Sequence, residues 1–420
     1  MRPRVSVGSP DRMSAHSRSE TRLDVAGALA SHAREFERVF GGGSHTRLFF
    51  SPGRINLMGA HLDYNGGPVM PTAVDRGTFI AVRARRDRRV VLASTLEDSK
   101  ALEVDLDSLP SARMARWSDY PLGVVIELAL IARASDREKE LSGLDVLFGG
   151  NLPVGAGLSS SASICVGTAF ALDAAWKLGL ARMDLVDAAL RAERNFVGVQ
   201  CGIMDPYAVG LARSNSLLWL DCKDRTYSYL PLDTETLSIG VADSLVRREL
   251  AQGAFNERVA QCREAFEVLS RRQTDATCLR DIRFDTLTEY QHELSSTARK
   301  RAHHVIPEVA RTFAARSSLQ RGDAEGFGAE MFRTHASLRD LFEVSVPELD
   351  TLVDSAAGAE GCLGARLTGA GFGGCAVLLV QKGSEASVQA RLTLDFTARF
   401  GRAPRVDFYG GDSGPREISR

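Results

Sequence analysis

The sequence predicts a two-domain protein of the mixed α/β (α+β) class. Its 420 residues are more than one hydrophobic core usually serves. Its hydrophobic and charged contents, 44% and 25%, are typical of globular proteins. Short apolar, strand-like segments are interspersed with longer segments in which apolar residues recur at helical spacing. We expect a disordered tail at 1–22, domains at 23–215 and 216–412, and a second tail at 413–420.

Charge and cysteine usage narrow the function classes. The 52 basic residues nearly balance the 53 acidic ones, which argues against broad attraction to nucleic acid or an anionic membrane. The seven cysteines lack C-x-x-C spacing, so neither a disulfide framework nor a zinc site is indicated. No apolar run has the length of a membrane span, and residues 1–20 lack the apolar core of a secretory signal. We expect a cytoplasmic protein that binds neither nucleic acid nor membrane.

The first elements are a helix and a strand followed by a polar loop. Apolar spacing predicts a helix over residues 23–40, and a short apolar strand from Leu48 leads into the loop. This loop, which ends at Gly67, carries Arg54, His61 and Asp63. The pair Asn65–Gly66 could mark a plain hairpin turn. Three chemically active side chains in one loop favour a functional site instead.

The segments that follow alternate strands with helices. Alternating apolar residues predict strands at 78–85 and 89–94, and helical spacing predicts a helix at 124–134. A strand at 144–148 then leads into the central segment of the chain, a glycine- and serine-rich loop.

This glycine–serine loop precedes a long apolar helix that ends near Leu178. Gly155 and Gly157 allow a sharp turn and a close approach to a ligand. The serines at 159–161 stand where the first helical N–H groups lack partners, and such a helix start binds anions. The loop therefore indicates either a phosphate site or an ordinary serine N-cap.

Two acidic residues follow in the next segments. Glu193 lies on a predicted helix at 183–197. Asp205 lies between Met204 and Pro206 in an apolar run, where burying a carboxylate costs several kcal/mol unless it has a partner. Asp205 is either a helix N-cap or a site residue.

The second half is predicted to be mainly helical, from residue 247 to about 358, after strands at 216–222 and 237–242. The glycine run 369–374 comes before a buried strand that ends at Val380. Because this run opens no helix, it does not indicate a dinucleotide site. The chain contains no G-x-x-x-x-G-K-[ST] segment, so it is not a P-loop protein.

Five segments resemble motifs of the galactokinase subfamily of the GHMP small-molecule kinases. In chain order, and in the family's order, they are Pro52–Gly67, Pro153–Ala162, Cys201–Asp205, His335–Asp350 and Leu367–Gly374. The resemblance implies a two-domain GHMP-kinase-like fold with its active site in the interdomain cleft. It also implies a sugar 1-kinase that transfers a phosphoryl group from ATP to the anomeric hydroxyl of a galactose-type sugar. We expect a monomer.

The resemblance also implies roles for individual residues. Asp205 would take the proton from the sugar's C1 hydroxyl or at least orient that hydroxyl. Arg54 would keep Asp205 ionised and balance charge on the transferred phosphoryl group. The implied sugar-binding residues are Arg54, Ala60, His61, Asp63, Gly202, Asp205 and Phe255. Those implied to bind ATP are Trp117, Tyr120, Gly155, Ala156, Gly157, Leu158, Ser159, Ser160, Ser161, Gly369 and Gly371. Ser161 and Glu193 are the implied Mg²⁺ ligands.

The chain departs from the family pattern at three positions. It has Ala60 where galactokinases usually have Glu, Phe255 where Tyr is usual, and Pro206 where Gln is usual. The first two changes concern the sugar pocket, where the glutamate is associated with the C6 side of galactose. Ala60 favours galacturonate, and L-arabinose and galactose stay open. A galactokinase-like sugar sensor that binds without turnover is the alternative function.

Overall fold

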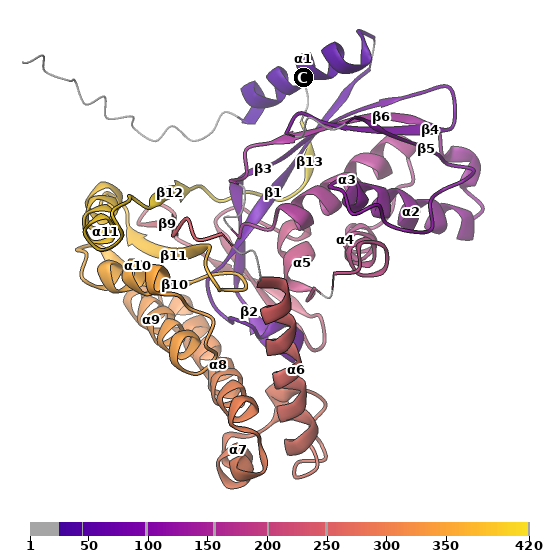
Figure 1. The fold of residues 1–420 in the computed structure, drawn as a ribbon. Coiled ribbons are helices and arrows are strands. Elements are labelled where there is room, and N and C mark those ends of the chain that lie inside the picture. Colours follow the sequence, from indigo (N-terminus) through magenta and orange to yellow (C-terminus); the bar gives the residue numbers. More distant parts are fainter. Residues whose placement is uncertain are drawn as a thin grey trace, which may run out of the picture.

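The computed structural model describes most of the chain, namely residues 25–43, 45–96, 100–153, 157–199, 201–247 and 251–418, with the backbone alone at 251–252. The predicted N-terminal tail lies outside these residues, as do Gly155 and Ala156. The described residues form helices and three sheets (Figure 1), so the predicted mixed class is confirmed. None of the described helices is long and apolar enough to span a membrane.

The first half is built on a six-stranded sheet with the order β13-β1-β3-β6-β4-β5. Its strands are β1 (Arg47–Asn56), β3 (Pro71–Ala84), β4 (Arg89–Ser94), β5 (Leu102–Asp105), β6 (Leu144–Gly150) and β13 (Arg416–Glu417). Only β4 and β6 pair in parallel. The central strands are buried along most of their length because helices cover both faces of the sheet (Figure 1).

Helix α1 (Val25–Phe40) covers one face, where Leu29 and Phe36 pack in a cluster with Phe50 and Phe79. The opposite face carries α2 (Asp119–Ala134), α3 (Ser160–Trp176), α4 (Arg182–Arg191) and α5 (Met204–Gly210). Helix α3 carries apolar residues all round, as a helix enclosed by protein does. Helix α2 begins five residues before the predicted start at 124, because a first helical turn tolerates Pro121.

The second half contains an antiparallel four-stranded sheet with the order β10-β11-β9-β12. Its strands are β9 (Leu237–Asp243), β10 (Cys362–Leu367), β11 (Cys375–Gln381) and β12 (Arg405–Tyr409). The helices are α6 (Ala251–Leu269), α7 (Phe284–Tyr290), α8 (Ser296–Gln320), α9 (Ala324–Asp340), α10 (Pro347–Ala357) and α11 (Glu385–Phe400). The predicted helical stretch 247–358 corresponds to α6–α10.

A small sheet of β2 (Pro68–Val69), β7 (Ser216–Asp221) and β8 (Tyr227–Pro231) joins the halves. In the polar loop after β1, Asp63–Asn65 form a short 3₁₀ turn, and β2 pairs with β7. The plain hairpin at Asn65–Gly66 is therefore wrong.

The end of the chain returns to the first sheet. Residues 413–420 were expected to form a tail, and this expectation is wrong at β13, which pairs with β1. Arg416 forms an ion pair with Asp412 at 2.6 Å and lies over the ring of Phe50. Ile418 packs against the cluster beneath α1. These contacts hold a segment whose composition is that of a loop.

The two halves meet where β1 ends and the turn between β10 and β11 begins. The guanidinium of Arg366, which is 1% exposed, donates hydrogen bonds to the carbonyls of Asn56 and Leu57, both at 2.6 Å. Thr368 donates a further bond to the Asn56 carbonyl. The Leu367–Gly374 motif and the residue before it are therefore hydrogen-bonded to the Pro52–Gly67 motif.

Candidate active site

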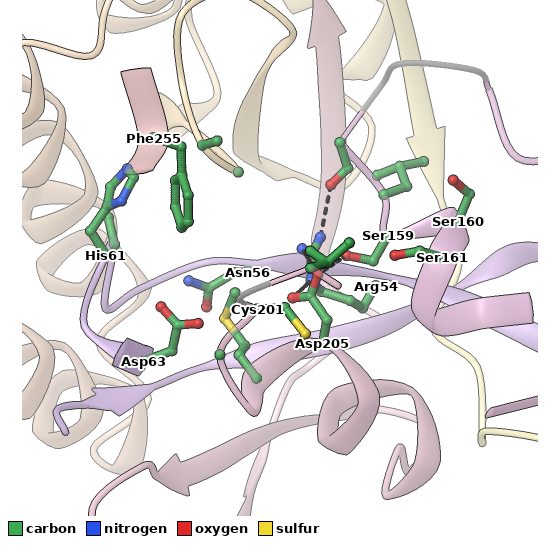
Figure 2. Close-up of a pocket in the computed structure, with 18 of the residues that line it drawn as sticks. Arg54, Asn56, His61, Asp63, Ser159, Ser160, Ser161, Cys201, Asp205 and Phe255 are labelled. Atoms are coloured by element: carbon green, nitrogen blue, oxygen red, sulfur yellow. Dashed lines mark hydrogen bonds and ion pairs between the residues drawn. The ribbon is translucent and has the colours of Figure 1, made fainter. Parts of the chain in front are cut away.

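A cavity of about 510 Å³ lies at this junction and draws its walls from both halves. Figure 2 shows Arg54, Asp205 and the three serines at one end, and His61, Asp63 and Phe255 at the other. The cavity brings together most of the predicted site residues that the structure describes, namely Arg54, Ala60, His61, Asp63, Gly157, Leu158, Ser159, Ser160, Ser161, Glu193, Gly202, Asp205, Phe255 and Gly369.

Arg54 and Asp205 form the central ion pair. Nε and Nη2 of Arg54 donate to the two carboxylate oxygens of Asp205, each at 2.7 Å, which is the strong bidentate arrangement. Nη1 donates to the carbonyl of Gly157 at 2.7 Å, and only 5% of Arg54 is exposed. Asp205 lies in the first turn of α5, whose N-cap is Ile203, so Asp205 is not an N-cap. The pair fixes a carboxylate at the cavity wall.

The serine loop turns its polar groups toward this carboxylate. Ser159 has a left-handed backbone, with φ of 54°, and precedes α3 without a side-chain capping bond. Its hydroxyl donates to Asp205 instead. The ordinary serine N-cap is therefore wrong. The first N–H groups of α3 stay available to an anion beside Ser160 and Ser161.

Glu193 lies on a π-helical turn, Ala192–Val197, a feature often found at functional sites. It is 2% exposed, and its Oε1 has no hydrogen-bond partner among the described residues. Burial raises the pKa of Glu193 to about 7, and the charge of Asp205 adds to the effect, whereas Cys201, Cys165 and Ser161 oppose it. A buried carboxylate oxygen without a partner beside a serine hydroxyl suits a hard cation.

These residues fit Mg²⁺, which takes one or two protein oxygens and completes its shell with phosphate and water. In the described part of the chain, no three His, Cys, Asp or Glu side chains could hold a metal ion together. Ser161 and Glu193 are thus suited to a cation that arrives with a phosphate ligand.

Asp63 and Gly202 fit closely together at the other end of the cavity. A Cβ on Gly202 would lie 1.7 Å from Oδ2 of Asp63, so only glycine allows this approach. Burial raises the pKa of Asp63 to about 6, assisted by the charge of Asp205. The charge of Asp205 therefore acts on this end of the cavity as well.

Aromatic rings form the neighbouring wall. His61 has a left-handed backbone, with φ of 58°, and its Nδ1 lies 2.9 Å from the hydroxyl of Tyr64. The ring of Phe255 lies 6.1 Å from that of His61 and 5.5 Å from that of Tyr64. With Ala60 beside them, these rings make the wall largely apolar.

Among the described residues, three of those predicted to bind ATP lie outside the lining of this cavity. Trp117 packs edge-on against Phe148, with ring centroids 5.7 Å apart, and Tyr120 packs against the core. Gly371 faces the backbone of Val344 and has a φ of 80° that disfavours other residues. Gly371 therefore allows the turn at 369–374 to pack closely against Val344, on the side away from the cavity.

Sequence reasoning missed several polar lining residues, among them Asn56, Tyr64, Asn256 and Arg366. Asn56 and Tyr64 lie inside the first motif, Pro52–Gly67, so the sequence could have identified them as site residues. Asn56 is 4% exposed, and its Oδ1 has no hydrogen-bond partner among the described residues. Arg366 is the single charged residue of β10. A buried cation needs hydrogen-bond partners, so its presence in an apolar strand could have indicated a specific role.

Three family models match the chain. They are the galactokinase galactose-binding signature over residues 34–84, the GHMP kinases N terminal domain over 124–213 and the GHMP kinases C terminal domain over 315–396. Galactokinase of Roseiflexus sp. (strain RS-1) is 39% identical over 372 residues, 88% of this chain and 92% of the relative. Galactokinase of Streptococcus thermophilus is 41% identical over 356 residues, 84% and 90% of the two chains.

Solved structures agree. The crystal structure of Lactococcus lactis galactokinase complexed with galactose matches with a TM-score of 0.87 and 32% identity, over 93% of this chain and all of the other. Mevalonate kinase of Methanococcus jannaschii, 18% identical with a TM-score of 0.61 over 88% of this chain and all of the other, shares the fold. The predicted family, two-domain fold and kinase class are confirmed, and the chain belongs to the galactokinase family of the GHMP kinases.

Proposed function

We propose that this protein transfers the γ-phosphoryl group of ATP to the anomeric hydroxyl of a galactose-configured sugar. The observation that supports this most strongly is the bidentate Arg54–Asp205 pair, with Ser159 on the same carboxylate, at the boundary between the serine loop and the aromatic wall. A carboxylate placed between an anion site and a polyol-sized space suits a kinase.

In this mechanism Asp205 accepts the proton of the sugar's C1 hydroxyl. The freed oxygen forms a bond to the γ-phosphorus as the bond to the β-phosphate oxygen breaks, and ADP leaves. Arg54 orients the carboxylate of Asp205 through its two hydrogen bonds and places positive charge near the transferred group. Phosphoryl transfer requires mainly such positioning and electrostatic stabilisation.

The serine loop and Glu193 serve the nucleotide end. The N–H groups at the start of α3 would bind phosphate oxygens, and Ser161 and Glu193 would hold Mg²⁺. When bound, that ion neutralises charge on the phosphates. Gly369 and Ala370 close the same end from the second half of the chain.

The C6 side of the sugar distinguishes the possible substrates. Where galactokinases usually have Glu and Tyr, this chain has Ala60 and Phe255. The wall beside His61 therefore lacks a carboxylate and a hydroxyl. Losing a hydrogen-bond acceptor for a sugar hydroxyl weakens the binding of galactose by about 1.5–3 kcal/mol. It also makes room for a uronate carboxylate, or suits a sugar without C6. Galacturonate is our first candidate, followed by L-arabinose and galactose.

A sugar panel tests the proposal. The protein is incubated with Mg-ATP and galactose, galacturonate, L-arabinose or N-acetylgalactosamine, and the phosphorylated carbon is identified. We expect a sugar 1-phosphate from at least one of them. Sugar binding without turnover on the whole panel would contradict a kinase and favour the sensor.

The variant Ala60→Glu tests the C6 argument separately. We expect its selectivity, measured as a ratio of kcat/KM values, to move toward galactose and away from galacturonate by about ten- to a hundredfold. The new carboxylate accepts a bond from the C6 hydroxyl and repels a second negative charge. If this ratio does not change, position 60 does not face C6.

A further inference from the structure

Two buried side chains of α8 hold the backbone of Ala60 from both sides. The N–H of Ala60 donates to Oε1 of Glu308 at 3.2 Å, and Nε2 of His304 donates to the Ala60 carbonyl, also at 3.2 Å. Both side chains are 0% exposed. They are four residues apart and therefore lie on the same face of the helix. Neither lines the cavity, but the residue between them does.

The side chains of Glu308 and His304 are connected to each other by a closed network of hydrogen bonds. Arg311 donates through Nε to Oε2 of Glu308 at 2.7 Å and through Nη2 to the hydroxyl of Ser337 at 3.1 Å. That hydroxyl lies 2.8 Å from Nδ1 of His304. Thr334 donates to Oε2 of Glu308 at 2.9 Å. A fully connected polar network of this kind specifies one geometry.

The protonation state and the tautomer of His304 follow from its surroundings. Burial and the neighbouring charge of Arg311 lower the pKa of His304 to about 3, so the ring is neutral. The Ala60 carbonyl can only accept, so the ring proton lies on Nε2, and Nδ1 accepts from Ser337. The donor to Ala60 is therefore fixed.

The held peptide precedes a strained residue of the cavity wall. His61 has a φ of 58°, which costs free energy in a residue with a side chain. The ring of Phe342 lies 4.6 Å from the rings of both His61 and His304. The backbone of Ala60 and the ring of His61 are thus both supported from the second half of the chain.

We propose that Glu308 and His304 are positioning residues for sugar recognition, which fix the Ala60 peptide and, through it, the ring of His61 in the cavity. This inference rests on the proposed function, because it places the sugar against this wall. It predicts that weakening the network impairs sugar binding specifically and leaves ATP binding and the chemical step nearly unchanged.

Matched pairs of variants test the proposal. Glu308→Leu and His304→Leu remove the bonds to Ala60. Glu308→Gln keeps an acceptor for its N–H, and His304→Gln keeps a donor for its carbonyl. We expect the KM for the accepted sugar to rise about ten- to a hundredfold in the Leu variants, and much less in the Gln variants. The KM for ATP should stay within about twofold.

Gln273→Leu is the control for general destabilisation. Gln273 is 4% exposed and bridges Asp281 and Arg283 away from the cavity. Its loss should lower the melting temperature without changing the sugar KM. If the Leu variants do not fold, Thr334→Val, which removes one hydrogen bond to Glu308, decides: its sugar KM should rise while its ATP KM does not.

Two results would overturn the proposal: an unchanged sugar KM in the folded Leu variants (or in Thr334→Val where those do not fold), or equal increases in the KM values for sugar and ATP. Sugar affinity measured by calorimetry without ATP gives the same answer independently of turnover. If the wild-type protein accepts no sugar and binds none, the proposed function fails, and the positioning role fails with it.

Discussion

At the scale of single residues, the charge of Asp205 reaches both ends of the cavity. It contributes to the raised pKa of Asp63 at the sugar end and of Glu193 at the nucleotide end. Burial is the larger cause in both cases, because a charged carboxylate loses its hydration. Arg54 is the cation that pairs with Asp205 between them, through two hydrogen bonds.

The pKa of Asp63 predicts how sugar affinity depends on pH. It is raised from 3.8 to about 6, so below pH 6 the free protein carries a neutral Asp63 that has lost one hydrogen-bond acceptor. We expect the sugar KM to rise as the pH falls through 6, by up to about tenfold per unit. For folding the sign is opposite, because stability from this group falls as the pH rises from about 4 to 6.

Steady-state kinetics between pH 5 and 8 measure this effect, with Asp63→Asn as the control that lacks the titrating group. A sugar KM that is constant over this range in the wild-type protein would show that Asp63 does not bind the sugar in its ionised form.

Gly202 is predicted to be irreplaceable for a steric reason. In Gly202→Ala the new Cβ would overlap the carboxylate of Asp63, at 1.7 Å from its Oδ2, and this carboxylate must swing away from the sugar. We expect the sugar KM to rise by about tenfold or more. Gly42→Ala, where a Cβ meets nothing within 4 Å, is the matched control. Equal KM values in both variants would contradict the close fit.

At the scale of elements, two irregular helix ends form the proposed metal site. Helix α3 starts at Ser160 directly after the left-handed Ser159, and the π-helical turn places Glu193 inward. We expect Ser161→Ala and Glu193→Gln each to increase the Mg²⁺ concentration for half-maximal activity about tenfold, because each removes or weakens an oxygen ligand. A magnesium titration measures this. Identical curves for both variants and the wild type would show that the metal is held elsewhere.

The elements also show which parts of the fold a sequence reveals. Motifs with unusual local composition were recognised, because glycine, serine and charged residues in apolar surroundings need a reason to be there. Strand β10 was missed because its residues, such as Gly364 and Arg366, do not alternate, and its geometry comes from pairing with β11 and from the carbonyls of β1. Strand β13 is too short for any periodicity, and contacts far away in the chain hold it in place.

The site was predictable to a similar degree. Residues whose chemistry is explicit, such as Arg54, Asp205 and Glu193, were identified from the family resemblance and line the cavity together. The network behind Ala60 was not, because Glu308 and Arg311 lie on a helix whose sequence resembles any amphipathic one. Such partners become visible only when α8 is placed against the loop.

At the scale of the whole molecule, the cavity exists only because the two halves close on it. The first half supplies Arg54, Asp205 and the serine loop, and the second half supplies Phe255, Arg366 and the glycine turn. Arg366 is buried with its charge satisfied by backbone carbonyls, and desolvation lowers its pKa to about 10. A ligand bound in this cavity would contact both halves of the chain at once, and its binding would therefore stabilise their association.

The central claim is that Asp205 performs the proton transfer in this cavity, and the turnover of Asp205→Asn tests it most directly. We expect kcat to fall about 10²–10⁴-fold, because the amide cannot accept the proton, while the affinities for ATP and sugar stay within a few fold. An Asp205→Asn protein that retains more than half of the wild-type kcat on the accepted sugar would contradict the account.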